Sequence, residues 1–205
     1  MLLNKKYWAD LLLIAVIILS SCNEKKVNPP EPKIDISTRE AALKEARILL
    51  GTDARIAFAG SFDKDTVREF IAGTEINKPD KWGIEFHLMK EDSGTFKKVY
   101  STGLLEGSFT GAHVSKEKLQ PNYDMVYYNS QDYYIGSGGG EIFAYLVDFN
   151  NRETYFAHLF MERGRSISLF LSNNVTPETK DFFLNVFKKD YSNLKIVSKD
   201  VELDE

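Results

Sequence analysis

The sequence predicts an α+β domain built mostly of antiparallel β-sheet, with one helix packed on it near each end of the chain. Three observations predict this fold class. Stretches in which apolar and polar residues alternate recur between about residues 56 and 172, and this period of two is that of half-buried strands. Residue pairs typical of tight turns separate several of these stretches. Helical periodicity is confined to one segment before them and one segment after them.

The first helix is expected over residues 38 to 50. Ser37 and Glu40 have the spacing of a capping box, in which each side chain satisfies a backbone N–H at the start of a helix. The apolar residues that follow fall on one face, and Gly51 is of the residue type that most often ends a helix. These apolar residues are Ala42, Leu43, Ala46, Leu49 and Leu50.

The second helix is expected to begin at Thr176 and to end near Asp190. Pro177 fits the first turn, where its missing N–H is not needed, and Glu178 lies near the positive end of the helix dipole. The face expected to be buried carries Phe182, Phe183, Val186 and Phe187. A last strand is expected over residues 194 to 197.

Most of the chain between the helices is predicted to form strands. Residues 84 to 88 alternate, and they are expected to form a hairpin with residues 96 to 101 across Asp92-Ser93-Gly94. The turn Asn129 to Asp132 is expected to separate two short strands. Residues 141 to 149 are apolar on both faces, which is typical of a strand in the middle of a sheet. The other expected strands cover residues 56–58, 69–74, 125–128, 133–135, 153–161 and 166–172.

Length and composition fit a single globular domain. The chain has 205 residues, of which 43% are hydrophobic, enough for one core but not for a second full domain. The net charge is -4, and loss of the first 21 residues, which carry +1, would make it -5. A nucleic-acid-binding protein needs a basic face to displace counterions from phosphates, so nucleic acid is not expected as a partner.

The first 22 residues have the three-part layout of a secretory leader. Lys5 and Lys6 form a basic start, nine apolar residues follow from Leu11 to Leu19, and two serines precede Cys22. Nine residues are far fewer than the roughly 20 that a helix needs to cross a bilayer. The alternative, a short buried core helix, is disfavoured because both flanks are polar and a Pro-rich stretch follows.

Leu19-Ser20-Ser21-Cys22 resembles the lipobox of bacterial lipoproteins, although Asp10 at the edge of the apolar run departs from the usual leader. The resemblance implies that residues 1–21 are a signal peptide that is removed, and that Cys22 carries lipid and anchors the chain to a membrane. It therefore implies a location in the cell envelope, with the domain in the periplasm or at the cell surface. The outer membrane is favoured over the inner one, but residues 23–26, which carry mixed charges, do not decide between the two membranes.

A tether is expected to follow the lipidated cysteine. Residues 22–36 contain Pro29, Pro30 and Pro32 and hold no apolar periodicity. In an extended form of about 3.1 Å per residue, such a spacer could hold the domain on the order of 40 Å from the lipid. Residues 37–199 are then expected to form the single domain, and residues 200–205 an acidic tail.

Part of the domain resembles a unit of the FG-GAP or VCBS type found in extracellular propellers. The resemblance rests on Ala59 to Asp65 running into Phe70 to Gly73, then Trp82, then Gly94 to Phe96, with a degenerate second copy from Tyr123 to Gly136 and at Tyr145. Two partial copies cannot close a propeller on their own.

An Asp-rich loop binds calcium in that family. Asp63 and Asp65 match two of its acidic positions here, but Lys64, Thr66, Val67 and Arg68 replace the rest. Calcium takes about 6 to 8 oxygen ligands, so whether Asp63 and Asp65 bind it is left open. No metal and no other cofactor is expected.

Two adjacent pairs of tyrosines, Tyr127/Tyr128 and Tyr133/Tyr134, lie on expected strands. Successive side chains of a strand point to opposite faces, so only one ring of each pair is expected in the core. The other ring is the candidate contact for a ligand, because tyrosine combines an apolar ring with a polar tip. The alternative is a sheet that packs one face and exposes the other to water, without any ligand.

No catalytic site can be assembled from the sequence with the spacing that chemistry demands. Glu85 and His87 would share a strand face, as an acid/base pair, as two metal ligands or, more simply, as part of a solvated face. His158 would share a face with Phe156 and Phe160 and is expected to be a half-buried structural histidine. The glycines from 136 to 140 precede an expected strand and not a helix, which argues against a phosphate-binding loop.

The expected function is therefore that of a membrane-anchored envelope lipoprotein acting as a non-enzymatic binding or accessory module. Its partner would be an envelope protein, a peptide or a glycan. Two alternatives stay open at this point: an envelope hydrolase with an unrecognised active site, and a structural or immunity-type lipoprotein.

Overall fold

The structure is a computed structural model that describes residues 33–109, 112–135, 139–162, 166–190 and 196–198. The chain divides into two compact units, Met1–Lys33 and Ile34–Glu205, and the described helices and strands all belong to the second. Cys22 and the expected signal peptide lie outside the described residues. Within the described ranges, no helix is long and apolar enough to span a membrane.

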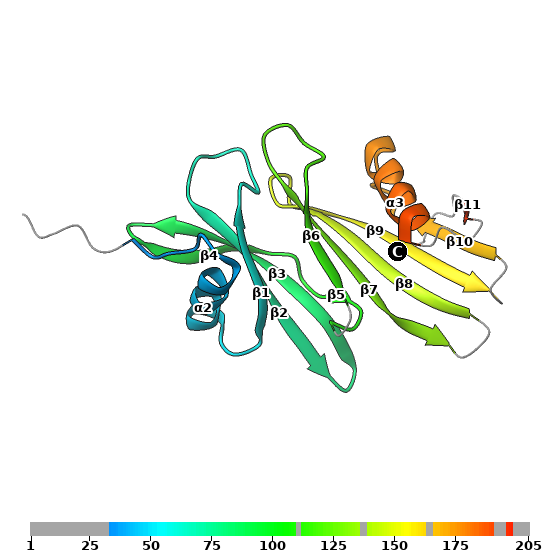
Figure 1. Cartoon of the computed structure of the whole chain (residues 1–205), viewed down its shortest axis with the longest axis horizontal. Coiled ribbons are helices and arrows are strands. Elements are labelled where there is room, and N and C mark those ends of the chain that lie inside the picture. Colours follow the sequence, from blue (N-terminus) through cyan, green and yellow to red (C-terminus); the bar gives the residue numbers. More distant parts are fainter. Residues whose placement is uncertain (1–32, 110–111, 136–138, 163–165, 191–195, 199–205) are drawn as a thin grey trace, which may run out of the picture. The chain divides into compact units, whose positions relative to one another are not determined.

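The described strands form two sheets, which Figure 1 shows. The first sheet has the order β1-β2-β3-β4, and β5 also pairs with β3. Its strands are β1 (Ala54–Gly60), β2 (Glu69–Lys78), β3 (Lys81–Asp92), β4 (Thr95–Ser101) and β5 (Leu105–Glu106). The short strand β5 has no counterpart among the strands expected from the sequence, because two residues cannot show an alternating pattern.

The second sheet has the order β11-β10-β9-β8-β7-β6. Its strands are β6 (His113–Glu117), β7 (Met125–Ile135), β8 (Gly139–Asp148), β9 (Glu153–Glu162), β10 (Ser166–Leu171) and β11 (Ile196–Ser198). All pairings in both sheets are antiparallel except that of β10 with β11, which is parallel. With one helix before the strands and one near the end, the predicted α+β class is confirmed.

The N-cap of helix α2 (Arg39–Leu50) lies one residue later than expected. The N-cap is Thr38, whose Oγ1 accepts a hydrogen bond from the N–H of Ala41 at 3.1 Å. The expected capping box of Ser37 and Glu40 is wrong, because the N–H of Ser37 instead donates to Asp35 in a local turn. The packed part of the chain also starts earlier than expected, since Ile36 is buried under the helix.

Strand β7 runs without interruption where a turn was expected. Its pairing with β8 shifts register between Ser130 and Tyr133, so one extra residue on β7 forms a bulge within a single strand. Two of the four polar residues that suggest a turn, Asn129 and Ser130, have no exposed surface, and the Asn129 amide donates to the hydroxyl of Tyr127 at 2.9 Å. Polar residues buried inside a sheet can have the same composition as a turn.

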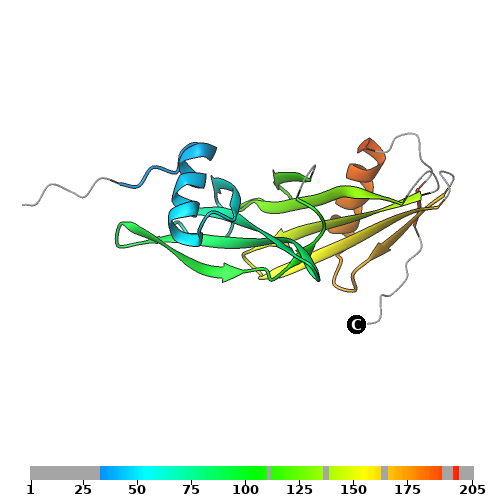
Figure 2. The same cartoon turned by 90° about the horizontal axis from the view of Figure 1, so that it is seen from below.

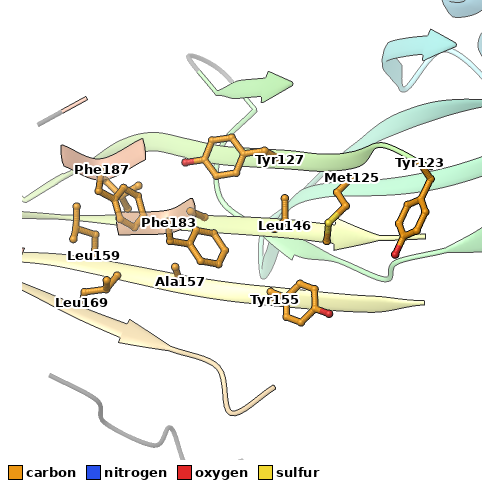
Figure 3. Close-up of a cluster of buried hydrophobic side chains, with 12 residues drawn as sticks. Tyr123, Met125, Tyr127, Leu146, Tyr155, Ala157, Leu159, Leu169, Phe183 and Phe187 are labelled. Carbon is orange, nitrogen blue, oxygen red and sulfur yellow. The ribbon is translucent and has the colours of Figure 1, made fainter. Parts of the chain in front are cut away.

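Among the residues that the structure describes, three apolar clusters hold the domain together. One fills the space between the second sheet and helix α3 (Pro177–Asp190), as Figure 3 shows, and includes Phe183 and Phe187 from the helix. A second joins Ile84 and Phe86 of the first sheet to Tyr145 and Val147 of the second. A third lies under α2, which rests on the first sheet in both views (Figures 1 and 2). The second sheet is therefore covered on both faces along the middle of β7 and β8.

Candidate binding site

A small hollow opens at the end of the hairpin formed by β2 and β3. Its volume is about 260 Å³, and its lining combines aromatic rings with an amide, a carboxylate and a hydroxyl group. The lining residues are Glu75, Ile76, Asn77, Trp82, Gly83, Ser108 and Phe109. We refer to this feature as the Trp82 hollow.

Trp82 is the dominant side chain of the hollow. It pairs with Asn77 across the hairpin, so the indole and the amide lie on the same face of the sheet. The side chain is 47% exposed, and it is the only aromatic residue that is exposed among the described side chains. Ile84 lies two residues further along the same face and is fully buried against side chains of the second sheet. The second sheet therefore covers Ile84 but does not reach Trp82.

The wall of the hollow opposite Trp82 depends on the close approach of β5 to β3. β5 lies beside Gly83, and a Cβ atom at that glycine would be 2.1 Å from the carbonyl oxygen of Leu105. No larger residue could therefore stand at position 83 without pushing β5 away. Ser108 and Phe109 follow β5 after Gly107 and complete the wall.

Two buried tyrosines of the second sheet hold this wall in place. The Tyr128 hydroxyl donates to the carbonyl oxygen of Gly107 at 2.9 Å, and the N–H of Glu106 donates to the Tyr145 hydroxyl at 3.2 Å. The two rings are stacked with centroids 5.9 Å apart. Tyr128 thus positions a wall of the hollow and does not itself lie on the surface.

The expectation that one ring of the pair Tyr127/Tyr128 faces solvent is wrong. Tyr127 is 1% exposed and packs against Phe182 of α3, with ring centroids 5.3 Å apart. Figure 3 shows Tyr127 in the same buried cluster as Phe183 of that helix. Tyr128 is fully buried on the opposite face, next to Phe86 of the first sheet. Side chains do alternate along β7, but a helix covers one face of this strand and a sheet covers the other.

For the second tyrosine pair, Tyr133/Tyr134, the structure describes the backbone only. The backbones of Tyr133 and Tyr134 belong to β7 and pair with Glu141 and Gly140. Their side chains lie outside the described ones, as does all of Cys22. The proposed binding role of Tyr133 and Tyr134 stays a prediction.

A second hollow of about 480 Å³ lies near the other face of the first sheet and contains His87. The imidazole is buried, with Nε2 2.7 Å from the Thr74 hydroxyl and Nδ1 2.7 Å from the Ser101 hydroxyl. Burial, together with the charge of Lys98, lowers the pKa of His87 to about 4. His87 is therefore neutral at pH 7, and the simple expectation that it lies on a solvated face with Glu85 is wrong.

His158 is half-buried among aromatic rings, as expected from its neighbours. Its nearest ring is that of Phe143 at 4.9 Å, and its Nε2 atom lies 3.4 Å from a carboxylate oxygen of Glu141. Burial lowers the pKa of His158, and the Glu141 carboxylate opposes this effect. The arrangement is that of a structural histidine in an aromatic face.

Three carboxylates lie close together at the loop between β1 and β2, which contains the candidate calcium ligands Asp63 and Asp65. Asp63, Asp65 and Glu69 each offer an oxygen, and these oxygens lie within 4.8 Å of one another. The ammonium group of Lys90 forms ion pairs with Asp63 and Asp65, and it lies 3.6 Å from Glu69. As they stand, these residues do not fit a calcium ion, because a cationic side chain already occupies the centre of the oxygen set.

Comparisons with known proteins give no relative. No family model matches the chain, and neither the curated proteins nor the solved structures contain a significant match. The kinship with FG-GAP or VCBS units consequently stays a prediction. A functional assignment for this chain has to come from the geometry of its own residues.

Proposed function

We propose that the chain is a bacterial envelope lipoprotein whose domain is a non-enzymatic binding module, and that the Trp82 hollow contacts a glycan. The observation that carries the proposal is the half-exposed indole of Trp82 beside the amide of Asn77 and the carboxylate of Glu75. Large exposed aromatic rings are costly to leave in water, and they are concentrated where proteins bind partners.

The chemistry of the lining fits a sugar ring. An indole offers a flat apolar face for the C–H side of a pyranose, and amide, carboxylate and hydroxyl groups can bond to its hydroxyls. The Glu75 carboxylate is oriented from the other side by Arg55, whose Nε donates to Oε2 at 2.8 Å. A volume of about 260 Å³ lies below the range of typical small-molecule pockets, so the hollow suits one ring of a longer chain.

A fluorescence titration tests this proposal directly. Trp8 and Trp82 are the only tryptophans, so a chain that begins at residue 23 reports on the hollow alone. Oligosaccharides of N-acetylated and of neutral sugars are the probes. We expect saturable quenching or a blue shift of the emission with one of them, and calorimetry with Asn77→Ala should show at least about tenfold weaker binding.

Val99→Ser is the matched control, because Val99 is an exposed apolar residue of the same sheet outside the hollow. It should bind the glycan as the unchanged chain does. Binding of a peptide or an envelope protein at Trp82, without any effect of the sugars, would keep the binding module and reject the glycan.

A hydrolase is a second candidate because His87 lies in a hollow between two hydroxyl groups. Its geometry resembles a hydroxyl nucleophile beside an imidazole base. A pKa of about 4 makes that base weak at neutral pH, since general bases work best with a pKa near the operating pH. Turnover of activated esters or glycosides that is lost in His87→Gln, with unchanged stability, would favour this candidate.

The anchor is tested separately from the hollow. We expect Cys22→Ala to release the chain from membranes washed with carbonate, because the lipid on Cys22 supplies the attachment. Retention of the Cys22→Ala variant in the washed membranes would mean that the anchor lies elsewhere.

A further inference from the structure

The loop between β1 and β2 brings three carboxylates together around one cation. Asp63, Asp65 and Glu69 carry three negative charges when ionised, and Lys90 contributes a single positive charge. The two other basic side chains of this loop are engaged elsewhere. Arg68 binds Glu91 and the carbonyl oxygen of Ile34, and Lys64 lies over the ring of Tyr123.

Glu69 is the buried member of this acidic cluster. Its side chain is 1% exposed, and Oε1 accepts hydrogen bonds from the N–H groups of Phe62 and Asp63. Oε2 points into the cluster and accepts no hydrogen bond from any described group. Burial and the neighbouring Asp63 carboxylate raise the pKa of Glu69.

Lys90 reaches the cluster because of the register of the hairpin. Glu69 and Lys90 are directly opposite each other on β2 and β3, so their side chains leave the sheet on the same face. Burial alone would lower the pKa of Lys90, but its bonds to Asp63 and Asp65 raise it above the ordinary value. The ammonium group, which comes from β3, is thus held in the acidic cluster and stays charged at neutral pH.

We propose that Asp63, Asp65 and Glu69 form a cation site whose built-in occupant is the Lys90 ammonium, and that loss of this ammonium opens the site to a divalent cation. Oxygens bound to one calcium ion lie at most about 5 Å apart, since each is 2.3–2.6 Å from the metal. The carboxylate oxygens here meet that limit at 4.8 Å. Without Lys90 the cluster would carry three negative charges, and calcium together with water could complete the coordination.

The proposal predicts opposite responses to calcium in two chains. The unchanged chain should have the same thermal midpoint with calcium, with magnesium and with chelator, because the ammonium excludes the metal. Lys90→Met keeps most of the aliphatic stem and removes the charge. Its midpoint should be lowered in chelator and should rise by about 5 °C or more in about 1 mM calcium.

Lys97→Met is the matched control, because Lys97 pairs with Asp92 in the same hairpin but is exposed. It should show no calcium response. Adding Glu69→Gln to Lys90→Met should remove the response, since the buried ligand loses its charge. If Lys90→Met is unfolded in chelator, calcium-dependent refolding is the readout. A calcium response of the unchanged chain, or none of Lys90→Met in either assay, would overturn the proposal.

Discussion

The two sheets of this domain differ in how completely their faces are covered. In the second sheet the middle strands are covered on both faces, and their tyrosine rings lie in the core with their hydroxyls hydrogen-bonded. In the first sheet the cover is incomplete. It leaves Trp82 exposed at one end, while Glu69 and His87 are buried as charged or titratable groups.

Because of this difference, the middle strands of the second sheet stabilise the domain, whereas the exposed end of the first sheet can contact a partner. A ring buried on both sides contributes to the free energy of unfolding but cannot touch a ligand. A ring left at the uncovered end of a sheet contributes little to stability and is available for binding. On this basis aromatic density alone is a poor guide to a binding surface.

The largest expected effect tests the covered sheet. Tyr127→Ala and Tyr128→Ala should each lower the free energy of unfolding by about 3–5 kcal/mol, because each removes a large ring from a packed core on a different face. Urea denaturation of the chain from residue 23 measures both. A loss below about 1 kcal/mol for either ring would mean that its face of the sheet is not covered.

The next effect concerns the buried histidine of the first sheet. Because the pKa of His87 is lowered from 6.5 to about 4, the unfolded chain takes up a proton below pH 6.5 that the folded chain does not. Stability should therefore be intact above pH 6.5 and should fall towards pH 4 by about 3 kcal/mol through this group. Urea denaturation at several pH values measures it.

His87→Gln should flatten that acid dependence, and His113→Gln is the control because His113 is exposed. Since burial also lowers the pKa of His158, part of the slope should remain in His87→Gln. An unchanged slope in His87→Gln would show that the imidazole is not buried as a neutral group.

A smaller loss of stability is expected where Tyr128 of the second sheet supports the wall of the Trp82 hollow. Tyr128→Phe keeps the ring but removes the hydroxyl that binds the carbonyl oxygen of Gly107. It should cost about 1 kcal/mol of stability and, because the wall of the Trp82 hollow loosens, weaken glycan binding severalfold. Stability and calorimetric affinity are measured on the same sample. Loss of stability with unchanged affinity would separate Tyr128 from the hollow.

The smallest expected change in stability is at the exposed end of the first sheet. Trp82→Ala should alter the free energy of unfolding by no more than about 0.5 kcal/mol while abolishing glycan binding. Urea denaturation monitored by circular dichroism measures it, since the variant has no tryptophan signal. A cost of several kcal/mol would place the indole in a core and remove the basis of the proposed hollow.

Trp82 was missed as a site residue because its position in the alternating pattern is that of a core residue. It is in phase with Ile84 and Phe86, which are both fully buried. A signal was nevertheless present, since Trp82 follows a charged turn and is the only tryptophan of the domain. In the acidic cluster, the sequence indicated Asp63 and Asp65 but not Lys90. Asp63 and Lys90 are 27 residues apart along the chain, and only strand pairing brings them together.

The sequence by itself determined most of the local elements of this protein, but not the short strands β5 and β6. Both helices, the β3–β4 hairpin and the central position of β8 follow from periodicity, caps and turn residues, which act over a few positions along the chain. Tertiary structure alone decided that β7 is one strand, that both faces of Tyr127 and Tyr128 are covered, and that the cover ends before Trp82. The physical reason is that burial depends on which distant element packs over a face, and no local pattern carries that information.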